Sequence, residues 1–245
     1  MVSFKELKSR VRNHFRFSKQ ELTGLLVAVL ATGFIFSFRN WGGDQFNLFS
    51  GLMNFLFTII ATAIAFFIPI AFQKIYALST GYKAEFRTWW IGILIALVLC
   101  FVSVGYLTVV LIGGMSSSFM TRHRLGKMRY GTSIEEQGMI GFWSPLGSII
   151  SAGLFGIFHH LWPKILFFEN GMMVSLVFAI CSILPIPRLE GLVIFFGSRG
   201  TYLMTILMVL AVALLLILGG LWGTIIGIVI GLSIGSYFML IGSEV

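Results

Sequence analysis

Seven stretches of the 245-residue chain are apolar enough and long enough to be considered as membrane spans. A transmembrane helix needs about 20 consecutive apolar residues. The polar segments between the stretches are short, and only 11% of the residues are charged, against about 25% in soluble domains. We therefore predict an all-α polytopic membrane protein in which residues 22–245 form a single transmembrane domain. The seven stretches are 22–38, 50–72, 90–114, 140–162, 172–196, 201–219 and 221–242.

Residues 1–21 form a separate basic segment. Its apolar residues Phe4, Leu7, Val11 and Phe15 have helical spacing, which predicts an amphipathic helix on the membrane surface. The alternative is a disordered tail that only orients the first span. The formal charge of +8 does not indicate nucleic-acid binding, because no folded basic module accompanies it. The six basic residues of this segment are Lys5, Lys8, Arg10, Arg12, Arg16 and Lys19.

The distribution of basic residues favours six crossings over seven. If every stretch crossed, the N-terminus and the basic loop 115–138 would lie on opposite sides, which the positive-inside rule disfavours. We predict that 90–114 is a re-entrant segment that turns near Ser103–Gly105. Both termini are then cytoplasmic. The returning residues 106–111 are β-branched and aromatic, which predicts a short strand.

Two prolines interrupt the stretch 172–196, which is the fourth of these six crossings. Pro185 and Pro187 each lack a backbone N–H and clash with the preceding helical turn, so the helix must unwind there. The break presents Glu190 beside Gly191. A carboxylate at a broken membrane helix indicates a binding site for a cation or a polar substrate. The alternative is a helix end at the interface, with Arg188 and Glu190 solvated.

The residues around this break carry a family resemblance. The string LPIPRLEG, residues 184–191, resembles the NxxPxPxLDG motif of the site-2 protease family of intramembrane zinc metalloproteases. In that family the Asp of the motif is the third zinc ligand, and Glu190 matches it; Ser182 matches the Asn. The segment 144–148, SPLGS, is similar to the family's GPxxN segment. The resemblance covers about residues 50–200 and implies a site-2-protease-like core.

The family's zinc-binding HExxH motif has no intact counterpart. The matching positions are Pro69, Ile70 and Gln73, which provide neither an imidazole nor a general base. His14 and His123 lie in basic segments, and His159–His160 are adjacent, so they cannot replace an i, i+4 pair. We predict no catalytic residues and no cofactor, with Glu190 as the sole matching metal-ligand position. The expected groove or polar cluster contains Gln73, Lys74, Ser182, Pro185, Pro187, Arg188 and Glu190, and Gln73, Lys74 and Arg188 are the candidate partners of Glu190.

The sequence therefore predicts a catalytically inactive pseudoprotease that binds membrane-embedded client peptides. The first alternative is an active intramembrane zinc metalloprotease. The second is a small transporter or ion carrier that uses the proline break as its site. Glycines spaced by four along 219–235 predict a helix-packing face, which could also support a homodimer.

Overall fold

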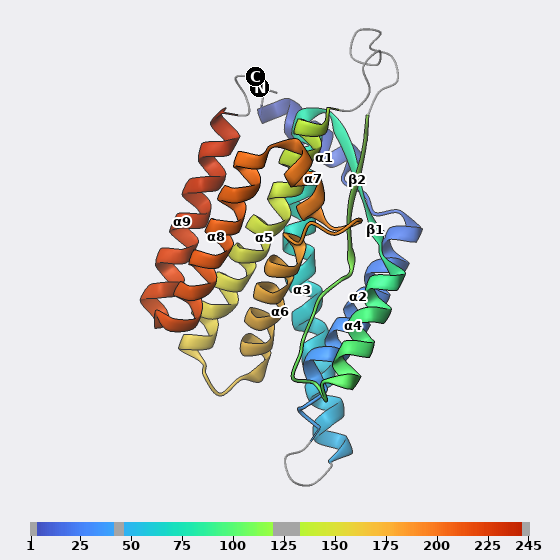
Figure 1. Cartoon of the computed structure of the whole chain (residues 1–245), viewed down its shortest axis with the longest axis vertical. Helices are drawn as coiled ribbons and strands as arrows, with labels where there is room; N and C mark the ends of the chain where they lie inside the picture. The colour runs from blue at the N-terminus through green and yellow to red at the C-terminus, as the bar shows by residue number, and fades with distance from the viewer. Residues whose placement is uncertain (1–3, 42–46, 120–132, 242–245) are drawn as a thin grey trace.

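The computed structural model describes residues 4–41, 47–119 and 133–241. This part of the chain is mostly helical and contains one two-stranded sheet (Figure 1). The strands are β1 (Tyr82–Thr88) and β2 (Gly113–Phe119). The helices are α1 (Phe4–His14), α2 (Lys19–Ser37), α3 (Leu48–Thr80), α4 (Trp90–Val102), α5 (Ile134–Leu161), α6 (Leu166–Ser182), α7 (Glu190–Gly197), α8 (Arg199–Leu218) and α9 (Gly220–Ile241).

Four of the described helices, α2, α3, α5 and α8, are long and apolar enough to cross a membrane. These helices indicate a membrane-embedded protein. Helices α4 and α6 and the Gly220–Ile234 part of α9 are shorter apolar segments, so the count of six crossings stays a prediction. The first turn of α1, the start of α5 and the last turn of α9 lie at one end of the molecule (Figure 1). The cytoplasmic location of this end is likewise a prediction.

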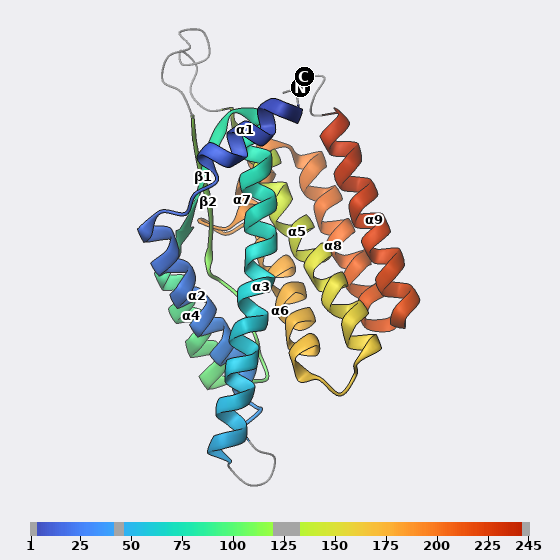
Figure 2. The ribbon, with the colours of Figure 1, turned by 180° about the vertical axis from the view of Figure 1, so that it is seen from behind.

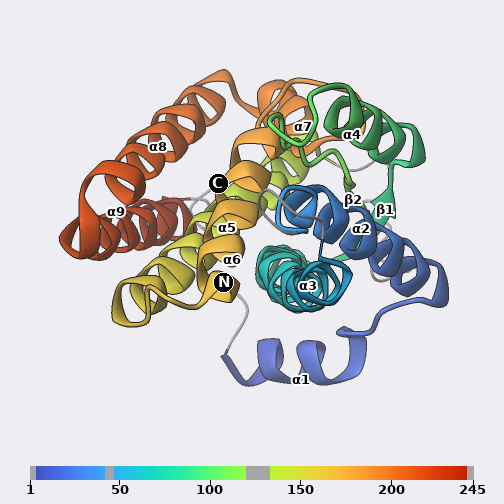
Figure 3. The ribbon, with the colours of Figure 1, turned by 90° about the horizontal axis from the view of Figure 1, so that it is seen from below.

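Helix α5 is the centre of the bundle. It packs against α3, α6, α7, α8 and α9 and is buried along nearly its whole length. Seen from below, α5 and α6 separate α8 and α9 on one side from α2, α3 and α4 on the other (Figure 3). The sheet lies beside α2 and α3, so it is placed next to the upper half of α3 (Figure 2).

The basic N-terminal segment contains a helix. Helix α1 lies across the upper end of α3 (Figure 2), and Arg10 Nη1 donates a hydrogen bond to the carbonyl of Leu78 at 3.1 Å. Of the two alternatives for this segment, the structure shows the helix.

The stretch 90–114 descends and returns without continuing as one helix. Helix α4 ends at Val102, and the chain reverses where Val104 and Gly105 take positive φ values of 54° and 76°. This confirms the predicted turn. The strand predicted at 106–111 is wrong, because those residues have no partner strand beside them; the paired strand β2 begins only at Gly113.

The side chains of strand β1 alternate strictly between buried and outward-facing positions. Tyr82, Ala84 and Phe86 are buried, and the charged residues between them point outward. Gly81, in the left-handed conformation with φ 88°, ends α3 and turns the chain into β1. The strands are antiparallel, with Phe86 opposite Met115.

The proline break has the predicted form. Helix α6 ends at Ser182, the chain is non-helical through Leu189, and α7 begins at Glu190. The stretch 172–196 is therefore two helices joined by a loop. Residues 120–132, which include His123 and several basic residues, and residues 242–245 lie outside the described part of the chain.

The glycines of the last stretch pack within the chain. A Cβ on Gly223 would lie 2.1 Å from the carbonyl oxygen of Leu215 in α8, and one on Gly231 would lie 3.5 Å from Ile149 in α5. The predicted helix-packing face is thus used by α8 and α5 of the same chain. The homodimer stays a prediction that needs another surface.

Candidate functional site

The structure brings Gln73 and Glu190 close to each other in buried positions. Gln73 lies in the upper half of α3, Glu190 is the first residue of α7, and the Gln73 amide interacts electrostatically with the Glu190 carboxylate. Both are buried, with exposed fractions of 2% and 4%. The backbone N–H of Met115 in β2 donates to Glu190 Oε1 at 2.7 Å, and Gln73 Nε2 donates to the carbonyl of Ile140 at 3.4 Å.

Three glycines allow the backbone to close around this carboxylate. A Cβ on Gly114 would lie 3.1 Å from Glu190 Oε1, and one on Gly141 would lie 3.3 Å from Oε2. Gly191 passes so near the proline loop that a Cβ there would lie 2.0 Å from the carbonyl oxygen of Ile183. Any larger residue at Gly191 would displace Glu190 from the site.

The other motif-like positions lie one helical turn away. Pro69 packs against α5 within the segment 144–148, where a Cβ on Gly147 would lie 2.7 Å from the Cα of Pro69. The segment 144–148 is therefore in direct contact with the α3 positions that match HExxH. Ile70 is 2% exposed and belongs to the hydrophobic core. Neither position presents a polar side-chain atom to Glu190.

The remaining members of the expected polar cluster are dispersed. Ser182 is buried, but its Oγ donates to the carbonyl of Ala179 at 2.8 Å within α6. Pro185 and Pro187 are exposed in the loop. Arg188 is exposed and has the left-handed φ of 74°. It forms no salt bridge with Glu190 or with another described residue.

The groups around Glu190 do not fit a zinc ion. They are a backbone N–H and a neutral amide, whereas zinc in proteins prefers thiolate, imidazole and carboxylate ligands. Within residues 4–41, 47–119 and 133–241, no three His, Cys, Asp or Glu side chains form a group that could hold a metal. His14 belongs to α1, and His159 and His160 to the last turn of α5.

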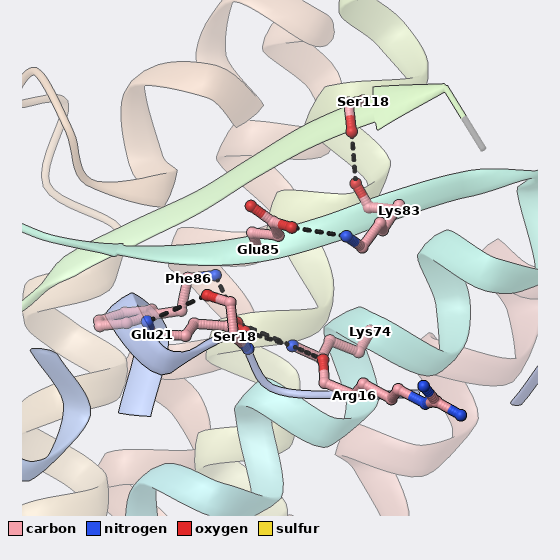
Figure 4. A network of polar contacts seen from close by, with 8 residues as sticks. All are labelled: Arg16, Ser18, Glu21, Lys74, Lys83, Glu85, Phe86 and Ser118. Atoms are coloured by element: carbon pink, nitrogen blue, oxygen red, sulfur yellow. Dashed lines mark hydrogen bonds and ion pairs between the residues drawn. The ribbon is translucent and has the colours of Figure 1, made fainter. Parts of the chain in front are cut away.

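Lys74 does not bind Glu190 but forms a second buried centre with Glu21 (Figure 4). Lys74 Nζ lies 2.7 Å from Glu21 Oε1, donates to the carbonyl of Arg16 at 3.1 Å, and lies 4.0 Å from the centre of the Phe17 ring. Ser18 and Glu21 form a capping box at the start of α2. Both charged groups are thus buried with their hydrogen-bonding capacity used.

The two carboxylates hold opposite edges of the sheet at the same rung. The N–H of Phe86, on the outer edge of β1, donates to Glu21 Oε1 at 2.7 Å. The N–H of Met115, opposite Phe86 and on the outer edge of β2, donates to Glu190. We call this arrangement the carboxylate clamp: Glu21 with Lys74 on one edge, Glu190 with Gln73 on the other.

Sequence reasoning missed Glu21, although the signal was present. The spacing Ser18-x-x-Glu21 directly before an apolar run is the sequence signature of a capping box. What the spacing does not reveal is that the same carboxylate also binds a strand 65 residues away.

A cavity of about 320 Å³ opens beside Glu190. Two exposed arginines, Arg87 at the end of β1 and Arg188 in the proline loop, line it, and neither forms a salt bridge with a described residue. The rest of the lining consists of Gly114, Met115, Ser116, Leu189, Glu190 and Val193. The cavity therefore combines a buried, hydrogen-bonded carboxylate with two exposed cationic side chains.

Comparison with known proteins gives one informative relative. The chain is 26% identical over 181 residues to a protein of Methanocaldococcus jannaschii that carries the name putative zinc metalloprotease. The matched region covers 72% of this chain and 84% of the relative. No protein-family model matches the sequence, and no solved structure gives a significant match.

Proposed function

We propose that this chain is a site-2-protease-like pseudoprotease that binds membrane-embedded peptide segments without cleaving them. The observation that carries the proposal is the state of Glu190. At the position that matches a zinc ligand, its carboxylate accepts a hydrogen bond from the backbone N–H of Met115, and the facing positions on α3 are Pro69 and Gln73. Similarity to a protein named as a zinc metalloprotease supports descent from a metal-dependent scaffold.

The client would bind at the cavity beside Glu190. The outer edge of β2 is occupied by Glu190 at Met115, so a client strand cannot pair there while this hydrogen bond exists. Arg87 and Arg188 remain available at the mouth of the cavity. They favour a client that carries an acidic residue next to its apolar stretch.

Metal analysis tests the loss of the zinc site. We expect the purified protein to hold no stoichiometric zinc and the triple variant Pro69→His/Ile70→Glu/Gln73→His to gain it, because the variant restores an imidazole pair opposite Glu190. Stoichiometric zinc in the parent, together with chelator-sensitive cleavage of a membrane peptide, would instead establish the active zinc metalloprotease that the relative's name suggests.

Crosslinking tests the client site. A photo-reactive amino acid at Val193, which lines the cavity, should capture a transmembrane peptide with a juxtamembrane Asp more efficiently than its Asn analogue. The matched control is the same group at Leu207, which is 68% exposed on α8. Equal capture at both positions would show contact through the lipid rather than at a site.

A further inference from the structure

A second cavity lies away from the candidate site, between α2 and α3. Its volume is about 680 Å³, and every residue that lines it is apolar. Phe66 and Ile70, with exposed fractions of 1% and 2%, form its floor. Leu26 and Leu30 on α2 and Phe67 on α3 are 41% to 60% exposed and form its rims. We call it the α2–α3 groove.

The length of the groove matches one leaflet of a bilayer. Its lining on α3 runs from Ile59 to Ile70, which is about 16 Å at 1.5 Å per residue. The hydrocarbon core of a membrane is about 30 Å thick. A transmembrane peptide would need a surface that extends through the full thickness, whereas the acyl chain of a lipid needs only half.

Positive charge is concentrated at one end of the groove. Phe17 and Leu22 line that end, and the exposed residues Arg16 and Lys19 flank Phe17. Neither forms a salt bridge with a described residue. The Arg16 side chain points away from Glu21 (Figure 4), whose own charge is compensated by Lys74. A net cationic patch therefore lies where the apolar groove ends.

We propose that the α2–α3 groove is a binding site for an anionic phospholipid. One acyl chain lies along the groove between the leucines of α2 and the aromatic residues of α3, and the phosphate is bound by Arg16 and Lys19. The apolar length fixes the depth of the lipid, and the basic pair selects its headgroup.

Lipid retention, measured by native mass spectrometry on the full-length protein in detergent, tests this site. We expect phosphatidylglycerol to be retained in preference to phosphatidylcholine. Ala63→Phe, which places a ring inside the groove, should abolish the retained species. The matched control Ile64→Phe adds a ring at a neighbouring residue of α3, 41% exposed and outside the groove lining, and should leave retention unchanged.

The headgroup is tested separately, with variants of exposed residues that leave the core intact. Arg16→Gln/Lys19→Gln should weaken phosphatidylglycerol binding roughly 25-fold, since each basic residue near an anionic surface contributes about 1 kcal/mol. Lys5→Gln/Lys8→Gln, which removes the same charge from α1, should change it much less. Equal retention of both lipids by the parent would overturn the proposal. Equal loss in the two charge variants, or equal retention by Ala63→Phe and Ile64→Phe, would do so as well.

Discussion

Adjacent residues of α3 bind different carboxylates on the two edges of one sheet. Gln73 and Lys74 differ by about 100° in direction around the helix axis, which is why one reaches α7 and the other α2. The neutral amide serves Glu190, and the ammonium serves Glu21. The carboxylate at the β1 edge therefore has a charged partner, Lys74. The carboxylate at the β2 edge, beside the cavity, has only the neutral amide of Gln73.

The Glu21–Lys74 pair gives the first prediction. Lys74→Met should lower the free energy of unfolding by about 3–5 kcal/mol, because it leaves Glu21 buried without its counter-charge. The double variant Glu21→Gln/Lys74→Met should recover part of this loss. Urea unfolding in detergent measures both. A double variant whose loss equals the sum of the losses of Lys74→Met and Glu21→Gln, each measured alone, would contradict the coupling.

Glu190 gives the second prediction. Glu190→Ala removes the acceptor for the Met115 N–H and should cost about 1–3 kcal/mol, whereas Glu190→Gln keeps an acceptor oxygen and should cost less. Hydrogen exchange at Met115, followed by mass spectrometry, should accelerate in the alanine variant alone. Unchanged exchange in Glu190→Ala would show that this carboxylate does not hold the strand.

For single residues, the sequence predicts those features that depend only on neighbouring residues in the chain. Two prolines with a following Glu-Gly are enough to predict the break and the position of Glu190. The sequence offers Lys74 only as one of three candidate partners of Glu190, because that carboxylate lies in the motif-like segment. The true partner of Lys74 depends on the packing of α2 against α3, which no local pattern contains.

Among the elements, the two strands show opposite degrees of predictability. β1 alternates buried and outward side chains, a pattern readable from the sequence although we did not predict a strand there. β2 has the sequence GGMSSSF, which has low β-propensity, and it forms because β1 and Glu190 supply partners for its backbone. The predicted strand at 106–111 has high propensity but no partner.

The contact of α3 with α5 at Pro69 yields a prediction for whole elements. Gly147→Ala should force these helices apart, because the added Cβ would meet the backbone of Pro69 at 2.7 Å. We expect a loss of about 1–3 kcal/mol in unfolding free energy. The control Gly231→Ala places its Cβ 3.5 Å from Ile149, an ordinary contact, and should be tolerated. Comparable losses in both variants would indicate a general effect of replacing helical glycines.

For the whole molecule, composition and charge distribution predict the class and an orientation, but the span count requires measurement. Apolar runs do not distinguish α4, which ends after 13 residues, from a crossing helix. The positive-inside argument was needed to infer the reversal at Ser103–Gly105 that the structure shows.

Cysteine labelling in sealed vesicles tests the orientation. Lys8→Cys in α1 and Arg199→Cys at the start of α8 should react with a membrane-impermeant maleimide from the same, cytoplasmic side. Lys164→Cys, between α5 and α6, should react from the other side. The native Cys100 and Cys181 are buried and give a low background. Labelling of Lys8→Cys and Lys164→Cys from one side would refute the topology.

The carboxylate clamp has a consequence for how the two-stranded sheet could bind a client peptide. Its two anchors are separate: one is a salt bridge between α2 and α3, and the other is a single buried acceptor that lines a cavity. A peptide that displaced Glu190 from the Met115 amide would leave the Phe86 edge tethered. The outer edge of β2 could then pair with the peptide while β1 stays attached to α2 through Glu21. Binding of a peptide would therefore not require the surrounding helices to unfold.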